Sequence, residues 1–307
     1  MKNLISIDHL SREEINKIHE KAEVFFKTNR LNKTKFFDDL EKKILINLFF
    51  ENSTRTRTSF EIAAKRLGAK VINIDISLSS LKKGETIIDT AKTINAMKPD
   101  FVVIRHNSSG IVTHLKNHIP ASLINAGDGT NEHPSQALLD SFVIKQHKGK
   151  LEGLKITICG DVLHSRVARS NIKLLSKFGC KINVVTPPTL MPHDYKAWLK
   201  QDWGIEVFEN ITDGIKEADV VMMLRIQQER MIGCYIPSLG EYYKTFGLDH
   251  EKLKNAKPDV IILHPGPINR DVEISSALAD DEKFSLILEQ VEAGVAVRQS
   301  ILCFLNN

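Results

Sequence analysis

Four consecutive residues near the start of the chain combine hydroxyl groups with a guanidinium, and they are Ser53, Thr54, Arg55 and Thr56. An apolar run ends before them at Phe50, and apolar residues then recur at helical spacing from Phe60 to Leu67, so the four residues occupy a predicted turn from a strand into a helix. Backbone N–H groups at a helix N-terminus favour an anion, and hydroxyl and guanidinium groups are good donors to phosphate. The spacing therefore predicts a phosphate site.

A helix cap is the simpler interpretation of the same residues. Asn52 or Ser53 would accept a hydrogen bond in the first turn of the helix, and the neighbouring arginines would then be solvated. Adjacent polar donors at the carboxyl end of a predicted parallel strand favour a ligand instead, because ligands bind at that edge of such sheets. The chain has neither G-x-x-x-x-G-K-[ST] nor G-x-G-x-x-G after a strand, so the common nucleotide-binding loops are not indicated.

Polar residues of a similar kind follow other apolar runs in the chain. They are Arg105, His133 with Gln136, Arg166, and Arg225 with Gln227. Each of these arginines alone would be an ordinary solvated strand end or helix start. Because the carboxyl ends of parallel strands share one edge of a sheet, their recurrence in both halves of the chain predicts an anion site built from several arginines.

Two loops could add to this site. Ser80 and Lys83 belong to a polar loop, residues 79–85, which is either an exposed flexible loop or a cover that closes over an anionic ligand. His264 begins a rigid turn after a predicted strand, and the carbonyl groups of this turn could line a pocket together with Gly266 and Pro267.

Short strands alternating with helical segments are expected to position these residues, which is typical of βαβ units in a parallel sheet. The first half contains predicted strands at Ile44–Phe49, Val71–Ile74, Phe101–Arg105 and Ser122–Asn125. The second half contains predicted strands at Lys155–Cys159, Lys181–Thr186, Ile205–Phe208, Val220–Leu224 and Val260–Leu263. The pattern predicts an α/β fold with two doubly wound parallel-sheet lobes.

Helices are expected to join the lobes. Pro134 suits the first turn of a helix and starts the predicted helix Pro134–Gln146. The segment Phe284–Leu305 is also helical in period, and its apolar positions are Leu288, Val291, Val295 and Leu302. We predict one domain at residues 1–134 and another at 135–283, with the C-terminal helix, 284–307, packing back on the first.

Composition and charge exclude several classes of protein. The chain of 307 residues is 42% hydrophobic and 26% charged, which predicts about two folded domains and no largely disordered protein. Its 42 Lys and Arg residues against 38 Asp and Glu residues give a formal charge of +4, without the basic runs of a dedicated nucleic-acid binder. A small excess of cations suits an enzyme with anionic substrates.

The cysteines and the apolar runs favour a cytoplasmic chain. The four cysteines are far apart and form no C-x-x-C pair, so neither a disulfide framework nor a zinc ribbon is indicated. His114 and His118 lack a nearby carboxylate or Cys and make a weak metal site. No apolar run approaches the roughly 20 residues that span a bilayer, and Asp8 interrupts the N-terminus before a signal-like segment develops. We therefore expect no metal and no membrane segment.

Four motifs are similar to those of the aspartate/ornithine carbamoyltransferase family. The run F-F-E-N-S-T-R-T from Phe49 resembles the family's carbamoyl phosphate signature F-x-[EK]-x-S-T-R-T, and Glu51 is typical of its aspartate branch. The other motifs are D-G-T-N-E-H-P-S-Q from Asp128, L-R-I-Q-Q-E-R from Leu224 and H-P-G-P-I-N-R from His264. Ornithine enzymes resemble H-C-L-P at the last motif, where this chain has no Cys. The resemblance extends over essentially the whole chain.

The resemblance implies transfer of the carbamoyl group from carbamoyl phosphate to the α-amine of L-aspartate in pyrimidine synthesis, without a cofactor. It places phosphate on Ser53, Thr54, Arg55 and Thr56, and it surrounds the carbamoyl group with Arg105, His133, Gln136, Gly266 and Pro267. It assigns the carboxylates of aspartate to Arg166, Arg225 and Gln227. It also implies a homotrimer in which Ser80 and Lys83 come from a neighbouring subunit, and an active site in the cleft between the domains.

The implied chemistry suits these residue types. A neutral amine attacks the carbonyl carbon, and Thr56, Arg105 and His133 would donate to the developing oxyanion, roughly 3–4 kcal/mol for one such donor in other acyl transfers. Arg55 and Lys83 would complete the catalytic set, and the leaving phosphate could take the amine proton. Two alternatives stay open, a carbamoyltransferase for ornithine or a related amine and a non-catalytic carbamoyl phosphate-binding homologue. Regulatory chains could also bind such a trimer, whereas nucleic acid and membranes are not expected partners.

Overall fold

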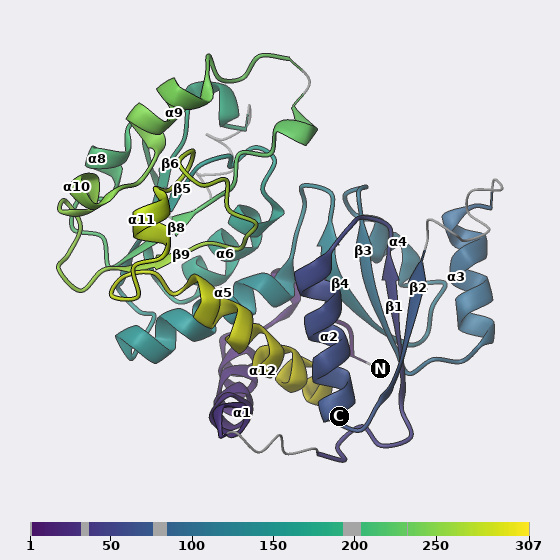
Figure 1. The fold of residues 1–307 in the computed structure, drawn as a ribbon. Coiled ribbons are helices and arrows are strands. Elements are labelled where there is room, and N and C mark those ends of the chain that lie inside the picture. Colours follow the sequence, from purple (N-terminus) through teal and green to yellow (C-terminus); the bar gives the residue numbers. More distant parts are fainter. Residues whose placement is uncertain (1, 32–36, 76–84, 193–203, 232, 307) are drawn as a thin grey trace. The chain divides into compact units, whose positions relative to one another are not determined.

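The computed structural model of the chain forms two compact units, which Figure 1 draws as ribbons. Unit 1 comprises Met1–Phe142 and Val291–Asn307, and unit 2 comprises Val143–Gln290. The structure describes residues 2–31, 37–75, 85–192, 204–231 and 233–306. The predicted domain boundaries after residues 134 and 283 remain a prediction.

Unit 1 contains a parallel sheet of four strands in the order β2-β1-β3-β4 (Figure 1). The strands are β1 (Ile44–Phe49), β2 (Lys70–Asp75), β3 (Phe101–His106) and β4 (Ser122–Asp128). Its helical segments are η1 (Ile7–His9), α1 (Arg12–Arg30), α2 (Thr54–Arg66), α3 (Ile87–Ala96), α4 (Ile111–Leu115), most of α5 (Pro134–Lys148) and most of α12 (Ile287–Asn306). The chain passes from β1 to β2 on one side and later continues with β3 and β4 on the other, so the strand order reverses between β1 and β3.

The sheet of unit 1 is apolar along nearly the whole length of its central strands. At most 2% of each of these strand residues is exposed, and they include Leu45, Ile46, Leu48, Val102, Val103 and Ile104; Leu123 and Ile124 of the edge strand β4 are fully buried as well. Continuous apolar runs of this kind are typical of parallel strands that are covered on both faces. The polar residues that follow these strands therefore begin where the buried core ends.

Helix α1 begins with a capping box and packs against α12. The Ser11 hydroxyl accepts from the Glu14 backbone N–H at 3.2 Å, and the Glu14 carboxylate accepts from the Ser11 N–H at 3.0 Å. Near the middle of the helix, the Ser300 hydroxyl of α12 donates to the Ile18 carbonyl at 2.7 Å. These contacts attach the C-terminal helix to the first helix of the chain, as Figure 1 also shows.

Unit 2 contains a parallel sheet of five strands in the order β7-β6-β5-β8-β9 (Figure 1). The strands are β5 (Lys155–Cys159), β6 (Lys181–Val185), β7 (Glu206–Phe208), β8 (Val220–Met223) and β9 (Ile261–Leu263). Its helical segments include α6 (Arg166–Lys177), η4 (Pro188–Leu190), α8 (Ile211–Gly214), η5 (Gln228–Arg230), α9 (Leu239–Phe246), α10 (His250–Leu253) and α11 (Ser276–Ala279). Here the strand order reverses between β5 and β8.

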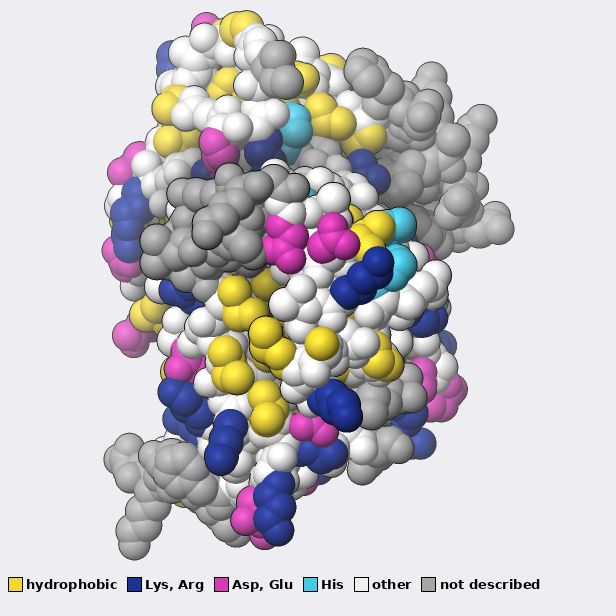
Figure 2. Space-filling view, turned by 90° about the vertical axis from the view of Figure 1, so that its right-hand side faces the viewer, with side chains coloured by type: hydrophobic (Ala, Val, Ile, Leu, Met, Phe, Trp, Pro, Cys, Tyr) yellow, Lys and Arg dark blue, Asp and Glu magenta, His cyan; other side chains and the backbone are white. Residues whose placement is uncertain are grey.

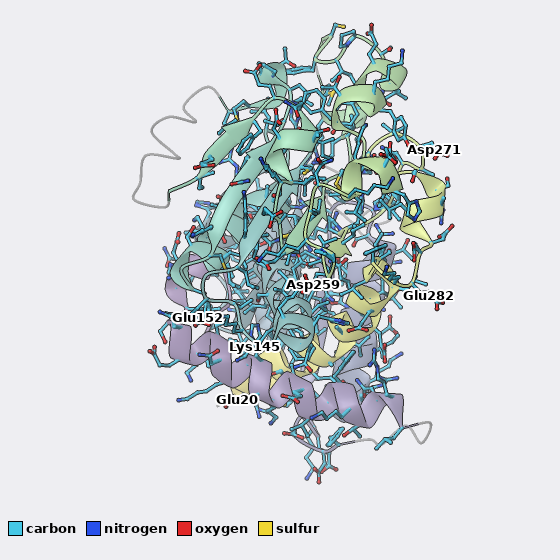
Figure 3. All side chains as sticks on the ribbon, turned by 90° about the vertical axis from the view of Figure 1, so that its left-hand side faces the viewer. Glu20, Lys145, Glu152, Asp259, Asp271 and Glu282 are labelled. Atoms are coloured by element: carbon cyan, nitrogen blue, oxygen red, sulfur yellow. The ribbon has the colours of Figure 1, made fainter. Side chains whose placement is uncertain are left out.

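Side-chain hydrogen bonds connect strands of unit 2 to the segments around them. The Thr157 hydroxyl and the Asn183 amide both donate to the Gly214 carbonyl, at 2.9 and 2.8 Å, and so tie β5 and β6 to α8. Near the start of β9, Lys148 donates to the Asp259 carboxylate at 2.8 Å, and Figure 3 labels Asp259. Side-chain hydrogen bonds, in addition to the backbone hydrogen bonds between strands, therefore attach the sheet to the segments that connect its strands.

All nine predicted strands are present, with ends within three residues of the predicted ones. The predicted helix from Pro134 is confirmed as α5, and the predicted C-terminal helix is confirmed as α12. The apolar face predicted for α12 is partly wrong, because Leu288 is 84% exposed and Val291 is 47% exposed. Alanines, Val297 and Ile301 bury the other faces of the helix, so an apolar period alone could not select the buried side.

The described part of the chain contains no helix that is long and apolar enough to cross a membrane. All four cysteines are free thiols, and three of them are buried. Burial raises the pKa of the Cys180 and Cys303 thiols to about 12 and that of Cys159 still higher, so these thiols stay protonated. Cys159 is therefore a residue of the core of unit 2.

Candidate active site

The predicted phosphate residues lie at the N-terminus of α2, directly after β1. Ser53 occupies the N-cap position with an extended backbone, but its hydroxyl makes no capping hydrogen bond to the helix. Instead the hydroxyl accepts from Nη1 of Arg105 at 3.1 Å. The first turn of α2 contains no acidic residue that would offset the positive end of the helix dipole. The simpler capping interpretation is therefore wrong for the Ser53 side chain.

The other residues of this motif line the first turn of α2. Thr54 and Arg55 are exposed, whereas Thr56 is 7% exposed. The Thr56 carbonyl accepts from the Ser59 hydroxyl at 3.0 Å, which fixes the backbone of this turn. The motif thus presents a guanidinium and a hydroxyl at the surface of a turn whose inner side is anchored in the core.

Arg105 comes from β3, the strand next to β1, and it joins the two strand ends. The register pairs Arg105 with Phe49, the last residue of β1. Its Nε donates to the Glu51 carboxylate at 3.1 Å, and both side chains are 18% exposed. Since β1 and β3 flank the reversal of strand order, Ser53 and Arg105 meet at the point where open parallel sheets bind their ligands.

His133 and Gln136 follow β4 in a turn that Asp128 holds together. The buried Asp128 carboxylate accepts from the Asn125 amide at 2.8 Å and from the Glu132 backbone N–H at 3.1 Å. His133 is 4% exposed, and the amide nitrogen of Gln136 donates to the Asp140 carboxylate at 2.9 Å. The carboxyl ends of β1, β3 and β4 are neighbours in the sheet, so the predicted residues of unit 1 lie along one edge.

A buried carboxylate joins two of the predicted segments of unit 2. Asp161 follows β5, is 0% exposed and accepts from the ring Nδ1 of His164 at 2.9 Å. It also accepts from the Gln227 backbone N–H at 3.2 Å, and the Gln227 side chain donates to the His164 carbonyl at 3.1 Å. The turn after β5 and the segment after β8 are thus tied together at the reversal of strand order in this sheet.

The two predicted arginines of unit 2 differ in their surroundings. Arg166 is the first residue of α6, follows the capping residue Ser165 and is 5% exposed. Arg225 follows β8, and both of its terminal nitrogens donate to the Glu229 carboxylate, Nη1 at 3.0 Å. Partial burial raises the pKa of Glu229, but the hydrogen bonds from Arg225 outweigh it, so this pKa lies below its ordinary value of 4.5. Glu229 therefore forms an ion pair with Arg225.

The turn that contains Gly266 and Pro267 is fixed by buried groups. Nδ1 of His264 accepts from the Gly266 backbone N–H at 2.8 Å, and Nε2 lies 3.2 Å from the Glu273 carboxylate. The side chains of His264 and Glu273 are both 0% exposed. Since Nδ1 accepts a hydrogen bond, Nε2 carries the proton and donates it to Glu273. This arrangement positions the turn at the carboxyl end of β9.

Several features of the candidate site complete the comparison with the sequence. Ser80 and Lys83 lie outside the described residues. His114 and His118 have ring centroids 5.8 Å apart, and the described residues contain no group of three potential metal ligands, so we assign no role to this pair.

Sequence reasoning missed the acidic partners Glu51, Asp140, Asp161 and Glu229. Of these, Glu229 carried a signal, because it lies only four residues after Arg225 and has the opposite charge.

Two protein-family models match the chain. Residues 2–146 match the model described as "Aspartate/ornithine carbamoyltransferase, carbamoyl-P binding domain". Residues 152–305 match the model described as "Aspartate/ornithine carbamoyltransferase, Asp/Orn binding domain". Together the two models cover nearly the whole chain, and the segment between them lies around the end of α5.

Curated proteins and solved structures agree with these matches. The chain is 54% identical over 300 residues to the aspartate carbamoyltransferase catalytic subunit of Granulibacter bethesdensis, covering 98% of this chain and 93% of that protein. The subunit of the same name from Parvibaculum lavamentivorans is 52% identical over 301 residues, with 98% and 90% covered. Aspartate transcarbamoylase from Trypanosoma cruzi, in complex with carbamoyl phosphate and aspartate, matches with TM-score 0.88, 29% identity and coverage of 98% and 94%. Ornithine carbamoyltransferase from Pyrococcus furiosus matches with TM-score 0.86, 27% identity and coverage of 98% and 96%.

Proposed function

The chain belongs to the aspartate/ornithine carbamoyltransferase family, and we propose that it transfers the carbamoyl group of carbamoyl phosphate to the α-amine of L-aspartate. The products are N-carbamoyl-L-aspartate and phosphate. One observation carries the proposal in the structure: Arg105 donates to the Ser53 hydroxyl, which leaves the N-terminus of α2 without a side-chain cap from that residue. A guanidinium and a helix N-terminus then face the same point, which suits a phosphate group.

In this proposal unit 1 holds carbamoyl phosphate. The phosphate lies on Ser53, Thr54, Arg55 and Thr56, and Arg105, His133 and Gln136 surround the carbamoyl group. Gly266 and Pro267 of unit 2 contribute backbone groups to the same substrate. The rigid turn that His264 and Glu273 hold supports this role, because it fixes the direction of those backbone groups.

Unit 2 holds L-aspartate through its two carboxylates. Arg166 and Arg225 supply two cations, and Gln227 supplies an amide whose backbone is anchored by Asp161. Two cations match a dicarboxylic acceptor, whereas the side-chain amine of ornithine would meet like charge. The two relatives described above are both named for aspartate, which supports the same acceptor.

The reaction is an acyl transfer to an amine. The neutral nitrogen of aspartate forms a bond to the carbonyl carbon, and negative charge develops on the carbonyl oxygen. Thr56, Arg105 and His133 donate to this oxygen, as in an oxyanion hole. The bond from the carbon to the phosphate oxygen then breaks, and the phosphate accepts the proton that the amine loses. Positioning of the two substrates contributes the remainder of the acceleration.

The oligomeric state is part of the proposal, and we infer a homotrimer in which Ser80 and Lys83 reach the site of a neighbouring subunit. Exposed apolar residues of unit 1 support a partner surface: Ile62 of α2 is 37% exposed, Ile72 of the edge strand β2 is 48% exposed, and Met97 is 63% exposed. Figure 2 shows hydrophobic side chains gathered on this side of unit 1. Exposed apolar residues on an edge strand favour pairing with another chain.

The cellular setting follows from the same proposal. We place the chain in pyrimidine synthesis in the cytoplasm, where four free thiols are stable. Many relatives are named catalytic subunits, which supports regulatory chains as further partners.

A product assay tests the acceptor. The purified chain is incubated with carbamoyl phosphate and either L-aspartate or L-ornithine, and the ureido product is identified by mass. We expect N-carbamoyl-L-aspartate as the product and at most trace carbamoylation of ornithine. Faster carbamoylation of ornithine, or phosphate release without a ureido product, would contradict the proposed function.

Hybrid trimers test the shared site. Lys83→Ala chains and Arg55→Ala chains are each expected to be nearly inactive, because each lacks a group that touches carbamoyl phosphate or aspartate. Mixing the two and reassembling them is expected to restore part of the activity, since some sites then take both intact residues from different chains. Hybrids that form, as mass measurement shows, but regain no activity would contradict sharing.

A further inference from the structure

Two ionisable side chains are buried in unit 1 beside the candidate carbamoyl site. Asp140 of α5 is 0% exposed, and Arg298 of α12 is 3% exposed. Burying a charged pair costs desolvation that its mutual attraction repays only in part, and apolar residues of similar volume are often equally stable there. The two charges therefore call for a role beyond stability.

Asp140 determines how the side chain of Gln136 is turned. The Gln136 amide nitrogen donates to the Asp140 carboxylate at 2.9 Å, one helical turn away, and Gln136 is 7% exposed. An ionised carboxylate only accepts hydrogen bonds, so the NH2 group of Gln136 must face Asp140. The amide oxygen of Gln136 is consequently on the branch that points away from Asp140, where it can accept a hydrogen bond.

Arg298 supplies a positive charge to the same buried region. Its guanidinium lies over the Phe60 ring of α2, 5.1 Å from the ring centroid, and its Nη1 donates to the Gly294 carbonyl at 3.0 Å. Burial lowers the pKa of Arg298 to about 10, and the charge of Asp140 acts in the opposite direction, so the group remains a cation at neutral pH. A cation in this position offsets the charge of Asp140.

Close packing holds Arg298 in place. A Cβ atom added to Gly294 would lie 2.5 Å from Nη1 of Arg298 and 3.5 Å from a methyl group of Leu139, the neighbour of Asp140. The glycine thus allows α12 to approach α5 at this level. The Arg298 guanidinium thus lies close to both Gly294 and the ring of Phe60.

We propose that Asp140, with Arg298 as its countercharge, is a positioning residue that fixes the Gln136 amide so that its oxygen accepts from the amino group of carbamoyl phosphate. The inference rests on the proposed function, since it assumes that Gln136 faces the carbamoyl group. Carbamoyl phosphate carries an NH2 donor where acetyl phosphate carries a methyl group. A fixed acceptor rejects the methyl group because the acceptor is then left without a partner, whereas an amide that can turn over loses this preference.

The first test replaces Asp140 by Asn and compares three ligands. In Asp140→Asn the neutral partner can offer either its oxygen or its NH2, so Gln136 is no longer held in one orientation. We expect the KM for carbamoyl phosphate to rise about tenfold, while the inhibition constants of inorganic phosphate and acetyl phosphate change less than about twofold. A purely structural role would weaken all three ligands together. An unchanged ratio of carbamoyl phosphate to acetyl phosphate affinity would overturn the proposal.

The activity of the wild-type chain shows whether a negative result contradicts only the positioning role of Asp140 or also the proposed function. If the wild-type chain forms no N-carbamoyl-L-aspartate, the proposed function fails and the inference fails with it. If the wild-type chain is active and Asp140→Asn keeps its preference for carbamoyl over acetyl phosphate, only the positioning role fails.

Further variants guard against misfolding and test the countercharge. The double variant Asp140→Asn with Arg298→Met leaves no unpaired buried charge, so it is expected to fold and to lose the same preference. Arg298→Lys keeps a cation and is expected to retain the preference to within about threefold. A loss in Arg298→Lys as large as in Asp140→Asn would overturn the countercharge role.

Ser141→Ala is the matched control on the same helix. Ser141 is also 0% exposed, but its hydroxyl lies 3.1 Å from the His19 ring nitrogen and so faces α1. We expect the control to leave the ratio of carbamoyl to acetyl phosphate affinity unchanged. An equal change in the control would show that any buried polar loss on α5 has this effect, and it would overturn the proposal.

Discussion

The two units place polar residues at the same point of their sheets but hold them differently. In unit 1, Arg105 donates to Ser53 and Glu51 where the strand order reverses, and Arg105 and Glu51 are each 18% exposed. In unit 2, Arg225 is paired with Glu229 next to the corresponding reversal, and the Glu229 side chain is 55% exposed. The partner of Arg105 in unit 1 is thus largely buried at the sheet edge, whereas the partner of Arg225 in unit 2 is an exposed side chain.

Under the proposed function, the difference bears on how each unit would bind its substrate. Water and salt weaken an exposed ion pair, so under the proposed function an incoming carboxylate would displace Glu229 from Arg225 at little cost. The pair in unit 1 is better shielded, and Arg105 keeps its direction through Ser53 as well. Under the proposed function, unit 1 would be preorganised for a small rigid anion and unit 2 would adjust more readily.

The largest effect on activity is expected when a cation is removed from unit 1. Arg55→Ala takes the guanidinium from the first turn of α2, and turnover is expected to fall on the order of a hundred- to a thousandfold, as for loss of a transition-state donor. The fold should stay intact because Arg55 is exposed. Steady-state rates and the melting temperature measure the two effects.

Arg57→Ala is the matched control for this variant. Arg57 is also exposed and lies two residues further along α2, on a different face of the helix. We expect a change in turnover of less than about threefold. Near wild-type activity of Arg55→Ala would refute the phosphate assignment, and equal losses in both variants would indicate a general effect of charge.

Removing the two acidic partners in turn sharpens the comparison. Glu51→Gln should tighten binding of inorganic phosphate about five- to tenfold, because the anion no longer competes with a shielded carboxylate for Arg105. Glu229→Gln should improve the inhibition constant of succinate, a dicarboxylate without the amine, by less than about threefold. Calorimetry for phosphate and competition kinetics for succinate give these values. A larger effect at Glu229 than at Glu51 would reverse the proposed order.

How much of this could be predicted depends on which interactions are local. The strands could be predicted because their apolar runs end at charged or small residues, and the motif after β1 could be placed at a helix start for the same reason. Glu229 lies four residues after Arg225 and is visible in the sequence. Glu51 lies 54 positions before Arg105, and only the register of β1 against β3 brings the two together.

The burial of polar residues was the other feature that could not be predicted from the sequence. Along α5, Asp140 and Ser141 are as buried as Leu138 and Phe142. A carboxylate in a helix is ordinarily read as solvent-exposed, and only a partner such as Arg298 on a distant helix changes that expectation. The same holds for α12, where apolar residues on most sides conceal which side is buried.

The smallest expected effect concerns the stability of unit 1 as a function of pH. His106, next to Arg105, packs its ring 4.6 Å from that of Phe50, and its Nδ1 accepts from the Ser108 backbone N–H at 2.8 Å. Burial lowers the pKa of His106 below its ordinary value of 6.5, although the charges of Glu51 and Asp128 oppose the shift. The unfolded chain then binds a proton more readily than the folded chain. The stabilisation is complete above the ordinary pKa and is lost as the pH falls through the lowered one.

His106→Asn tests this dependence, because an Asn oxygen can accept from the N–H two residues later as Nδ1 does. The wild-type melting temperature is expected to fall more than that of the variant between about pH 7.5 and about pH 5.5. His114→Asn, at an exposed position of α4 in the same unit, should keep the wild-type dependence. If His106→Asn and His114→Asn lose the same amount on acidification, the charge state of His106 does not contribute. A smaller loss in His106→Asn alone would show that the end of β3, which holds Arg105, weakens as this ring gains its proton.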